Sequence, residues 1–454
     1  MRARMIPAIL TVSALIATSV AATATADGAG RPHQPNVSHE WTAYHGNLLR
    51  TGHSTSMPKF HGHLHVVKNI GLDGAVYASP IVARGLTIVA TENDTVYAFG
   101  PKNRLVWKRR LGRPSPAGER PCGNIDPLGI TGTPIFNRAD GLVYVAPEFS
   151  GNPPTHRLYA LHIGSGKIAF HRTLDLRGVA REAMQERGAL TIADGRVWVP
   201  FGGLAGDCGQ YKGRVVGWRL NGSGKPIKYT VPTAREAGIW APPGPTVTRD
   251  GSLYVAVGNG ASGVGDRYDH SDSVLRINGR ANLTGSFSPT TWATDNEADL
   301  DLGSQGPAIV HGKWVFIAGK SGTAYVLHAR HLGGIGGQVS KRNICTSFGG
   351  TAVLGSVVYA PCTDGVKAIR IGPRGRMRVL WKADGTTTGS PVIGGGAVWA
   401  LDTGTGILHA LGKAGGRSRA AVSVGAVSRF ATPALSGRRI FVGTLSGLTI
   451  VSYR

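Results

Sequence analysis

Short hydrophobic runs separated by polar turns recur along the whole chain, and they follow one internal order. Each unit opens with a small residue and proline, continues with a β-branched run and a Tyr- or Trp-centred run, and ends in a glycine-containing turn. The clearest copy runs from Ala78-Ser79-Pro80 through 86–90 and 95–99 to 105–107. Seven further copies contain the hydrophobic runs 142–145, 196–199, 253–255, 314–317, 357–359, 397–400 and 440–443.

The repeat predicts the fold. Each copy holds four short strands in about 35 to 50 residues, which is the size of one blade of a β-propeller. We therefore expect an all-β, eight-bladed propeller with four-stranded antiparallel blades. The last copy supplies only three strands before Arg454, and an unpaired strand edge invites aggregation. Residues 63–70 alternate polar and apolar side chains, so we expect this N-terminal strand to complete the last blade and close the ring.

The beginning of the chain predicts export. Arg2 and Arg4 precede an apolar run over 6–22, and Ala24-Thr25-Ala26 forms a cleavage signature. We interpret 1–26 as a signal peptide cleaved near Ala26, 27–40 as a disordered leader, and 41–454 as a single propeller domain. The mature protein is then secreted to the outside of the cell or into the periplasm. No later stretch reaches the ~18 apolar residues of a membrane span, so we predict none.

Four cysteines fit an oxidising compartment. We expect Cys345 to pair with Cys362, seventeen residues away, which leaves Cys122 with Cys208. Four cysteines allow three connectivities, so the sequence leaves the pairing open. A zinc site is disfavoured because no close Cys-x-x-Cys pair is present.

Charge suggests partners but names none. The full chain carries +24, and loss of Arg2 and Arg4 with the signal peptide leaves +22. Such a field attracts polyanions in general, so the expected partner is an unknown protein or an anionic envelope polymer. Basic residues are scattered over the turns, with Lys108-Arg109-Arg110 as a short cluster, and we predict no dedicated nucleic-acid site.

The Ser-Pro or Thr-Pro starts, the Tyr-Ala-Leu-like third strands and turns such as 164–167 resemble the pyrroloquinoline-quinone-like propeller superfamily. The resemblance covers nearly all of the mature chain. Trp41 to Gly46, followed by Arg50-Thr51-Gly52, is similar to the opening of many such propellers, and we expect it to fasten the N-terminal segment to the ring. The superfamily includes quinone- and calcium-dependent dehydrogenases of alcohols and sugars, and also non-catalytic propellers, so the fold does not settle the function.

The resemblance implies candidate site residues in the most dehydrogenase-like stretch, 253–322. Asp299 or Asp301 would be the catalytic base, Lys320 would contact the quinone, and Asn259 would bind calcium. Asp207 would stand in for a glutamate calcium ligand, and Trp240 would form the stacking floor. A hard divalent ion, a carboxylate base and a nearby cation suit this chemistry.

One departure from the family pattern and one ordinary structural role weigh against catalysis. Many of the dehydrogenases cover the quinone with a disulfide of adjacent cysteines, and no two cysteines are adjacent here. Asn and Asp at glycine-rich strand ends also commonly satisfy turn backbone without any ligand. The sequence therefore favours a non-catalytic binding or scaffold protein that needs no cofactor. The alternative is a dehydrogenase that holds quinone and calcium.

Overall fold

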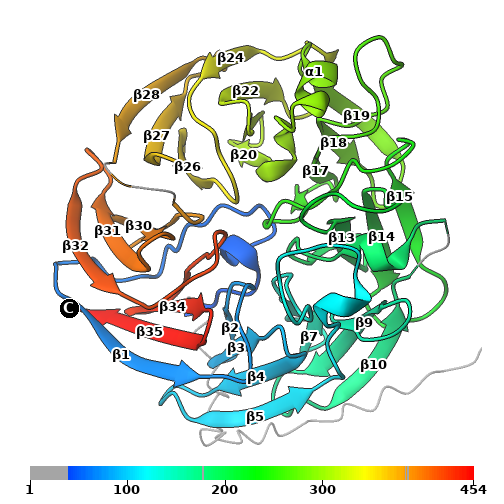
Figure 1. The fold of residues 1–454 in the computed structure, drawn as a ribbon. Helices are drawn as coiled ribbons and strands as arrows, with labels where there is room; N and C mark the ends of the chain where they lie inside the picture. The colour runs from blue at the N-terminus through cyan, green and yellow to red at the C-terminus, as the bar shows by residue number, and fades with distance from the viewer. Residues whose placement is uncertain (1–38, 176–177, 384, 386–387) are drawn as a thin grey trace, which may run out of the picture. The chain divides into compact units, whose positions relative to one another are not determined.

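The computed structural model describes residues 39–175, 178–383, 385 and 388–454. Over these residues, the strands form eight sheets arranged in a ring, which is the predicted eight-bladed β-propeller (Figure 1). The expected signal peptide and residues 27–38 of the expected leader lie outside the described residues. Glu40, the last residue of that leader, pairs with Arg138.

We number the blades in chain order from the first complete copy. Blade 1 holds β2 (Ile81–Ala83), β3 (Leu86–Ala90), β4 (Thr95–Phe99) and β5 (Leu105–Arg110). Blade 2 holds β6 (Ile135–Asn137), β7 (Leu142–Val145), β8 (Glu148–Phe149), β9 (Thr155–His162) and β10 (Ile168–Thr173). Blade 3 holds β11 (Met184–Gln185), β12 (Thr191–Ala193), β13 (Arg196–Gly203), β14 (Arg214–Arg219) and β15 (Ile227–Thr230). Blade 4 holds β16 (Thr246–Val247), β17 (Leu253–Val257), β18 (Ser273–Ile277), β19 (Leu283–Ser288) and β23 (Gly334–Ile335).

The remaining blades have four strands each. Blade 5 holds β20 (Ala308–Val310), β21 (Trp314–Ala318), β22 (Thr323–His328) and β24 (Ser340–Asn343). Blade 6 holds β25 (Ala352–Leu354), β26 (Val357–Cys362), β27 (Gly365–Ile371) and β28 (Met377–Lys382). Blade 7 holds β29 (Val392–Gly394), β30 (Ala397–Asp402), β31 (Ile407–Gly412) and β32 (Ser418–Ser423). Blade 8 holds β33 (Ala434–Ser436), β34 (Arg439–Thr444), β35 (Gly447–Tyr453) and β1 (Leu64–Gly71).

Blades 2, 3 and 4 depart from the four-strand expectation because each gains one two-residue strand. β8 pairs with the start of β9, β11 pairs with the end of β13, and β23 runs parallel to β19. Each addition comes from a longer loop whose backbone finds its hydrogen bonds on a free stretch of a neighbouring strand. The four main strands of each blade are unaffected.

The N-terminal strand closes the ring as predicted. β1 lies antiparallel to β35, with Val66 opposite Val451 and Ile70 opposite Leu448 (Figure 1). Leu64, Val66 and Ile70 are half-buried and pack on the core of blade 8. The outer edge that the chain end would otherwise expose is therefore paired.

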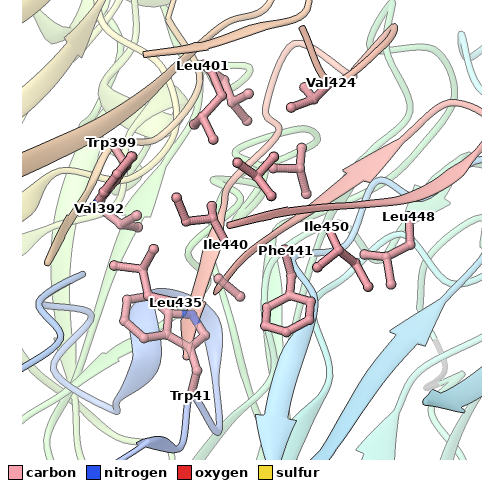
Figure 2. Close-up of a cluster of buried hydrophobic side chains, with 14 of the residues drawn as sticks. Trp41, Val392, Trp399, Leu401, Val424, Leu435, Ile440, Phe441, Leu448 and Ile450 are labelled. Carbon is pink, nitrogen blue, oxygen red and sulfur yellow. The ribbon is translucent and has the colours of Figure 1, made fainter. Parts of the chain in front are cut away.

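Hydrophobic side chains fill the space between neighbouring blades. The inner strands are buried on both faces, as β4 shows at every position, whereas the outer strand β5 leaves most side chains in solvent. Figure 2 shows a cluster that spans blades 7, 8 and 1 and includes Trp41, Trp399 and Phe441. This cluster joins the first described residues to the last two blades.

Residues 41–60, which we call the lead-in, cross the middle of the ring (blue in Figure 1). Their backbone and Arg50 form hydrogen bonds with the inner strands or strand starts of six blades, at Val82, Phe136, Leu190, Val247, Val353 and Ile393. Gly46 has a φ of +80°, and a Cβ there would come within 2.8 Å of the Trp41 ring, so only glycine fits. The expectation that this motif fastens the N-terminal segment to the ring is confirmed.

Antiparallel blades give the ring two different faces. The turn between the first two strands of each blade lies on one face, which we call the turn face. The connections that lead from one blade to the next lie on the other, the connection face, and they include 111–134, 174–190, 231–245, 289–307, 344–351 and 424–433. Short helices also occur in these connections: η3 (Ala117–Glu119), η4 (Arg181–Ala183), α1 (Trp292–Glu297) and η5 (Leu302–Ser304); η2 (Tyr44–Gly46) lies in the lead-in. Among the described helices, none has the length and apolar character needed to span a membrane.

Candidate functional site

Three aromatic side chains from distant connections meet at the centre of the connection face. Trp240 belongs to the connection between blades 3 and 4, Phe348 to that between blades 5 and 6, and Phe430 to that between blades 7 and 8. The ring centroids of Trp240 and Phe430 lie 6.2 Å apart, edge to face, and those of Phe348 and Phe430 lie 6.4 Å apart. All three rings are half-buried, so they form an apolar surface that solvent still reaches.

Two arginines stack on these rings. The guanidinium of Arg429 lies 3.8 Å from the centroid of Phe348 and 6.0 Å from that of Phe430, and the guanidinium of Arg187 lies 5.1 Å from that of Phe430. A stacked guanidinium is held flat while the N–H groups at its edge stay free for a carboxylate or phosphate. Within residues 39–454, as far as the structure describes them, neither arginine forms an ion pair.

The surroundings of Arg187 are polar and partly buried. Burial lowers the pKa of Arg187, while the carboxyl of Glu92 and the hydroxyl of Tyr77 raise it and the charge of Arg429 lowers it. An arginine remains protonated despite such shifts. The two guanidinium charges therefore repel each other at the centre of the connection face, and a bound anion would relieve that repulsion.

A small cavity borders this cluster. Its volume is about 20 Å³, and its lining includes Tyr44 of the lead-in, Tyr77, Thr131, Arg187 and Phe430. That volume is enough for about one water molecule. A ligand at this centre would consequently rest on the aromatic surface, because this cavity is too small to hold it.

The proposed base, cation and stacking floor do come together beside the aromatic cluster. The Nζ of Lys320 pairs with Asp299 and lies 2.7 Å from Oδ2 of Asp301, and it stands 5.5 Å from the ring centroid of Trp240. Burial lowers the pKa of Lys320, but Asp301 and Asp299 raise it more, so the net shift is upward. Lys320 is therefore a fixed cation over the face of Trp240.

The two candidate bases differ sharply in exposure. Asp299 has 62% of its side chain in solvent, whereas the side chain of Asp301 is completely buried. Oδ1 of Asp301 accepts a hydrogen bond from the backbone N–H of Gly303 at 2.7 Å and so caps η5. Burial raises the pKa of Asp301, and Lys320 opposes that shift. Asp301 thus has partners for both oxygens and no route to a substrate.

The two candidate calcium ligands each have a partner within the protein. Asp207 accepts a hydrogen bond from the hydroxyl of Tyr211 at 2.5 Å. Asn259 follows Gly258, which borders Trp240 and Asp301, and the backbone carbonyl of Asn259 accepts from Ala237. In the part of the chain that the structure describes, no three carboxylates or histidines bring ligand atoms within 4.8 Å of one another.

These observations test whether the residues fit a quinone. Lys320 covers the face of Trp240, Phe430 approaches the same indole, and the carboxyl that would act as base is sealed from solvent. A tricyclic quinone needs an open aromatic face and a base that its substrate can reach. The residues in this arrangement do not fit that cofactor.

Both expected disulfides are present, and both fix the connection face. Cys345 is bonded to Cys362, and Cys122 is bonded to Cys208. The first anchors the connection that carries Phe348. The second joins the connection from blade 1 to blade 2 with the β13–β14 loop, and it packs beside Tyr77. Structural disulfides form in oxidising compartments, so the protein belongs outside the cytoplasm.

A second group of buried acids lies behind Arg187, between blades 1, 2 and 3. Glu92, Asp94, Glu148 and Glu186 are all less than 4% exposed. Burial and the neighbouring carboxylates raise the pKa of Glu92 to about 7 and that of Asp94 to about 9. Burial alone would lower the pKa of His156, but Glu148 and Asp175, at 3.1 and 2.9 Å, raise it to about 10. These shifts make the region sensitive to pH.

Sequence reasoning missed Arg187, Phe348, Arg429 and Phe430. A signal for Arg187, Phe348 and Phe430 was present in the sequence. These three residues occupy the same position of the repeat, three residues before its proline or the residue that takes the place of proline. Phe430 precedes Pro433 in this way, as Tyr77 precedes Pro80 and Thr131 precedes Pro134. Alignment of the eight copies would therefore have pointed to the residues that gather at the centre of the connection face.

Comparisons with known proteins address the fold. No family model and no curated protein matches the chain. Among solved structures, quinohemoprotein alcohol dehydrogenase from Comamonas testosteroni has a TM-score of 0.71 at 15% identity, over 93% of this chain and 81% of that one. A europium-containing methanol dehydrogenase gives 0.67 at 12% identity, over 92% and 99%. BamB from Moraxella catarrhalis gives 0.60 at 17% identity, over 86% and 100%.

The resemblance predicted from the repeats is therefore confirmed at the level of fold, and these identities carry no activity over to this chain. The chain has an eight-bladed β-propeller fold, which it shares with these solved structures.

Proposed function

We propose that the protein is a non-catalytic binding protein that acts outside the cytoplasm and holds an acidic partner at the centre of its connection face. The observation that supports this proposal is the stacking of Arg187 and Arg429 on Phe430 and Phe348, with no ion pair to either arginine among the described residues. Arginine on an aromatic surface is a frequent anchor at protein interfaces. The solved structures with the same fold include both dehydrogenases and BamB, so the fold allows this reading.

The net charge of the chain does not replace this local argument. A basic surface attracts acidic molecules weakly and without preference, and salt screens that attraction over about 8 to 10 Å. A partner held by stacked arginines would depend on those two side chains and would survive moderate salt better than diffuse binding. Salt dependence and substitution of these two arginines can therefore distinguish binding at this site from diffuse attraction by the net charge.

The experiment is a pulldown from an envelope extract at low and high salt. The bait is the purified protein, the variant Arg187→Gln with Arg429→Gln, or a control, Arg280→Gln with Arg374→Gln. The control removes the same charge from exposed turns of blades 4 and 6. We expect one captured species to persist at high salt with the unchanged protein and with the control variant. The variant Arg187→Gln with Arg429→Gln should not capture this species. Equal capture by both variants would contradict the proposal.

Dehydrogenase activity is the second candidate because Asp301, Lys320 and Trp240, the residues that the family resemblance implies, lie together. The buried Asp301 and the covered face of Trp240 would have to open before a quinone could bind there. The test is addition of pyrroloquinoline quinone and Ca²⁺ to the purified protein, followed by dye reduction over a panel of alcohols and sugars. We expect no reduction above that of a protein-free control. A rate that Asp301→Asn abolishes would establish the dehydrogenase instead.

A further inference from the structure

The turn face, opposite the aromatic cluster, carries a groove of about 630 Å³. The lead-in forms one wall through residues that include His53, and the turns of blades 4, 5 and 6 form the rest. This volume lies inside the ~300 to 1,000 Å³ that small-molecule sites occupy. No step of the function proposed above uses this groove.

The floor of the groove is apolar and rigid. Tyr254, Ile309, Ala329 and Val353 line it, and each is buried. The hydroxyl of Tyr254 donates to the backbone carbonyl of Ala329 at 2.5 Å, which leaves the ring to present its apolar surface. Such a floor would bind a hydrocarbon or aromatic body by removing it from water.

The rim of the groove is basic. Arg249, Arg330 and His311 are exposed and line it, and within the residues that the structure describes neither arginine forms an ion pair. Asp250 is the carboxylate of the lining, but it pairs with Arg276 at 2.8 Å and accepts hydrogen bonds from Thr248 and Ser252. The charge that remains on the rim is therefore positive.

We propose that this groove binds a small molecule that joins an apolar body to a single acidic group. The apolar body would lie on Tyr254, Ile309 and Val353, and the acidic group would face Arg249 and Arg330. Arginine suits this role because its fork of N–H donors matches a carboxylate, sulfonate or phosphate. The inference rests on the turn face alone, so it stands whether or not the connection face binds an acidic partner.

The test uses two probes that differ in one group. 1-Anilinonaphthalene-8-sulfonate carries an apolar body and a sulfonate, and N-phenyl-1-naphthylamine has the same body without the charge. Fluorescence titration and equilibrium dialysis would measure the affinity and the number of bound molecules for each probe. The proteins are the unchanged chain, Arg249→Gln with Arg330→Gln, and the charge-matched control Arg280→Gln with Arg374→Gln.

We expect the unchanged protein to bind the sulfonate about tenfold more tightly than the neutral probe. The Arg249 and Arg330 variant should lose that preference, while its affinity for the neutral probe and its melting temperature stay the same. The control variant should match the unchanged protein. The proposal is overturned if the rim variant keeps its preference for the sulfonate, or if the control loses it equally.

Discussion

The hydroxyl of Tyr44 donates a hydrogen bond to Oγ of Ser390 at 2.7 Å, although 346 residues separate the two in sequence. The same hydroxyl accepts from Thr432 at 3.1 Å, so one lead-in residue joins the starts of blades 7 and 8. Burial raises the pKa of Tyr44 to about 12, which keeps the hydroxyl protonated and able to donate. The lead-in is therefore part of the ring's centre.

Loss of this hydroxyl should weaken the whole ring. Tyr44→Phe removes two buried hydrogen bonds, to Ser390 and from Thr432, and we expect the free energy of unfolding to fall by about 1 to 2 kcal/mol. Urea denaturation followed by circular dichroism measures this change. Tyr229→Phe is the matched control, because the buried Tyr229 hydroxyl has no hydrogen-bond partner among the described residues. The control should keep or gain stability, and equal losses in both variants would contradict the role given to Tyr44.

Lys320 should act as a structural counter-ion of Asp301. Lys320→Met leaves a fully buried carboxylate with one unpaired oxygen, and we expect a loss of about 3 to 5 kcal/mol at neutral pH. The double variant Lys320→Met with Asp301→Asn removes that charge and should recover most of the loss, since asparagine can still accept from Gly303. Thermal unfolding of the three proteins checks this. If Lys320→Met unfolds at the same temperature as the unchanged protein, Lys320 does not stabilise the fold by pairing with Asp301.

Asp94 should make the protein less stable in alkali. The pKa of Asp94 rises from 3.8 to about 9 on folding, so the folded chain binds the extra proton between these values. Stability that is present below about pH 4 is then lost as the pH rises through 9, by at most about 1.4 kcal/mol per pH unit. Asp94→Asn cannot ionise, so it should be more stable than the unchanged protein above about pH 7 and equal to it near pH 4.

Urea midpoints across the pH range would measure this difference. Asp266→Asn, at an exposed carboxyl, serves as the control and should follow the unchanged protein at every pH. A pH profile that Asp94→Asn leaves unaltered would place the titrating group elsewhere.

The disulfides should stabilise the chain unequally. Cys122 and Cys208 close a loop of 86 residues, while Cys345 and Cys362 close one of 17. From the loss of chain entropy, we expect replacement by alanine to cost about 4.6 kcal/mol for the first pair and about 3 kcal/mol for the second. Melting temperatures of the two double variants check the order, and a larger loss for the Cys345 and Cys362 pair would contradict it.

The sequence predicted the blades well because strand periodicity and turn residues are local signals. The pairing of β1 with β35 could also be predicted, since the count of strands left one edge open. The burial of individual polar side chains could not be predicted from the sequence in the same way. Asp299 and Asp301 look alike in sequence, yet the structure seals Asp301 under η5 and leaves Asp299 in solvent.

The aromatic and arginine cluster was harder to predict for a related reason. Phe348 and Phe430 lie 82 positions apart in sequence. They meet only because the ring brings the connection between blades 5 and 6 and the connection between blades 7 and 8 together at the centre of one face. Nothing near either residue in sequence marks it as a binding residue. The repeat position that they share is the signal that sequence comparison within the chain could have used.

The affinity of a labelled decaglutamate peptide, measured by fluorescence anisotropy, tests the acidic-partner site most directly. We predict that Arg187→Gln with Arg429→Gln weakens binding at least about tenfold, or about 1.4 kcal/mol, while Arg280→Gln with Arg374→Gln changes it less than about twofold. If the two variants weaken binding equally, the peptide responds to net charge alone, and the centre of the connection face is not the binding site.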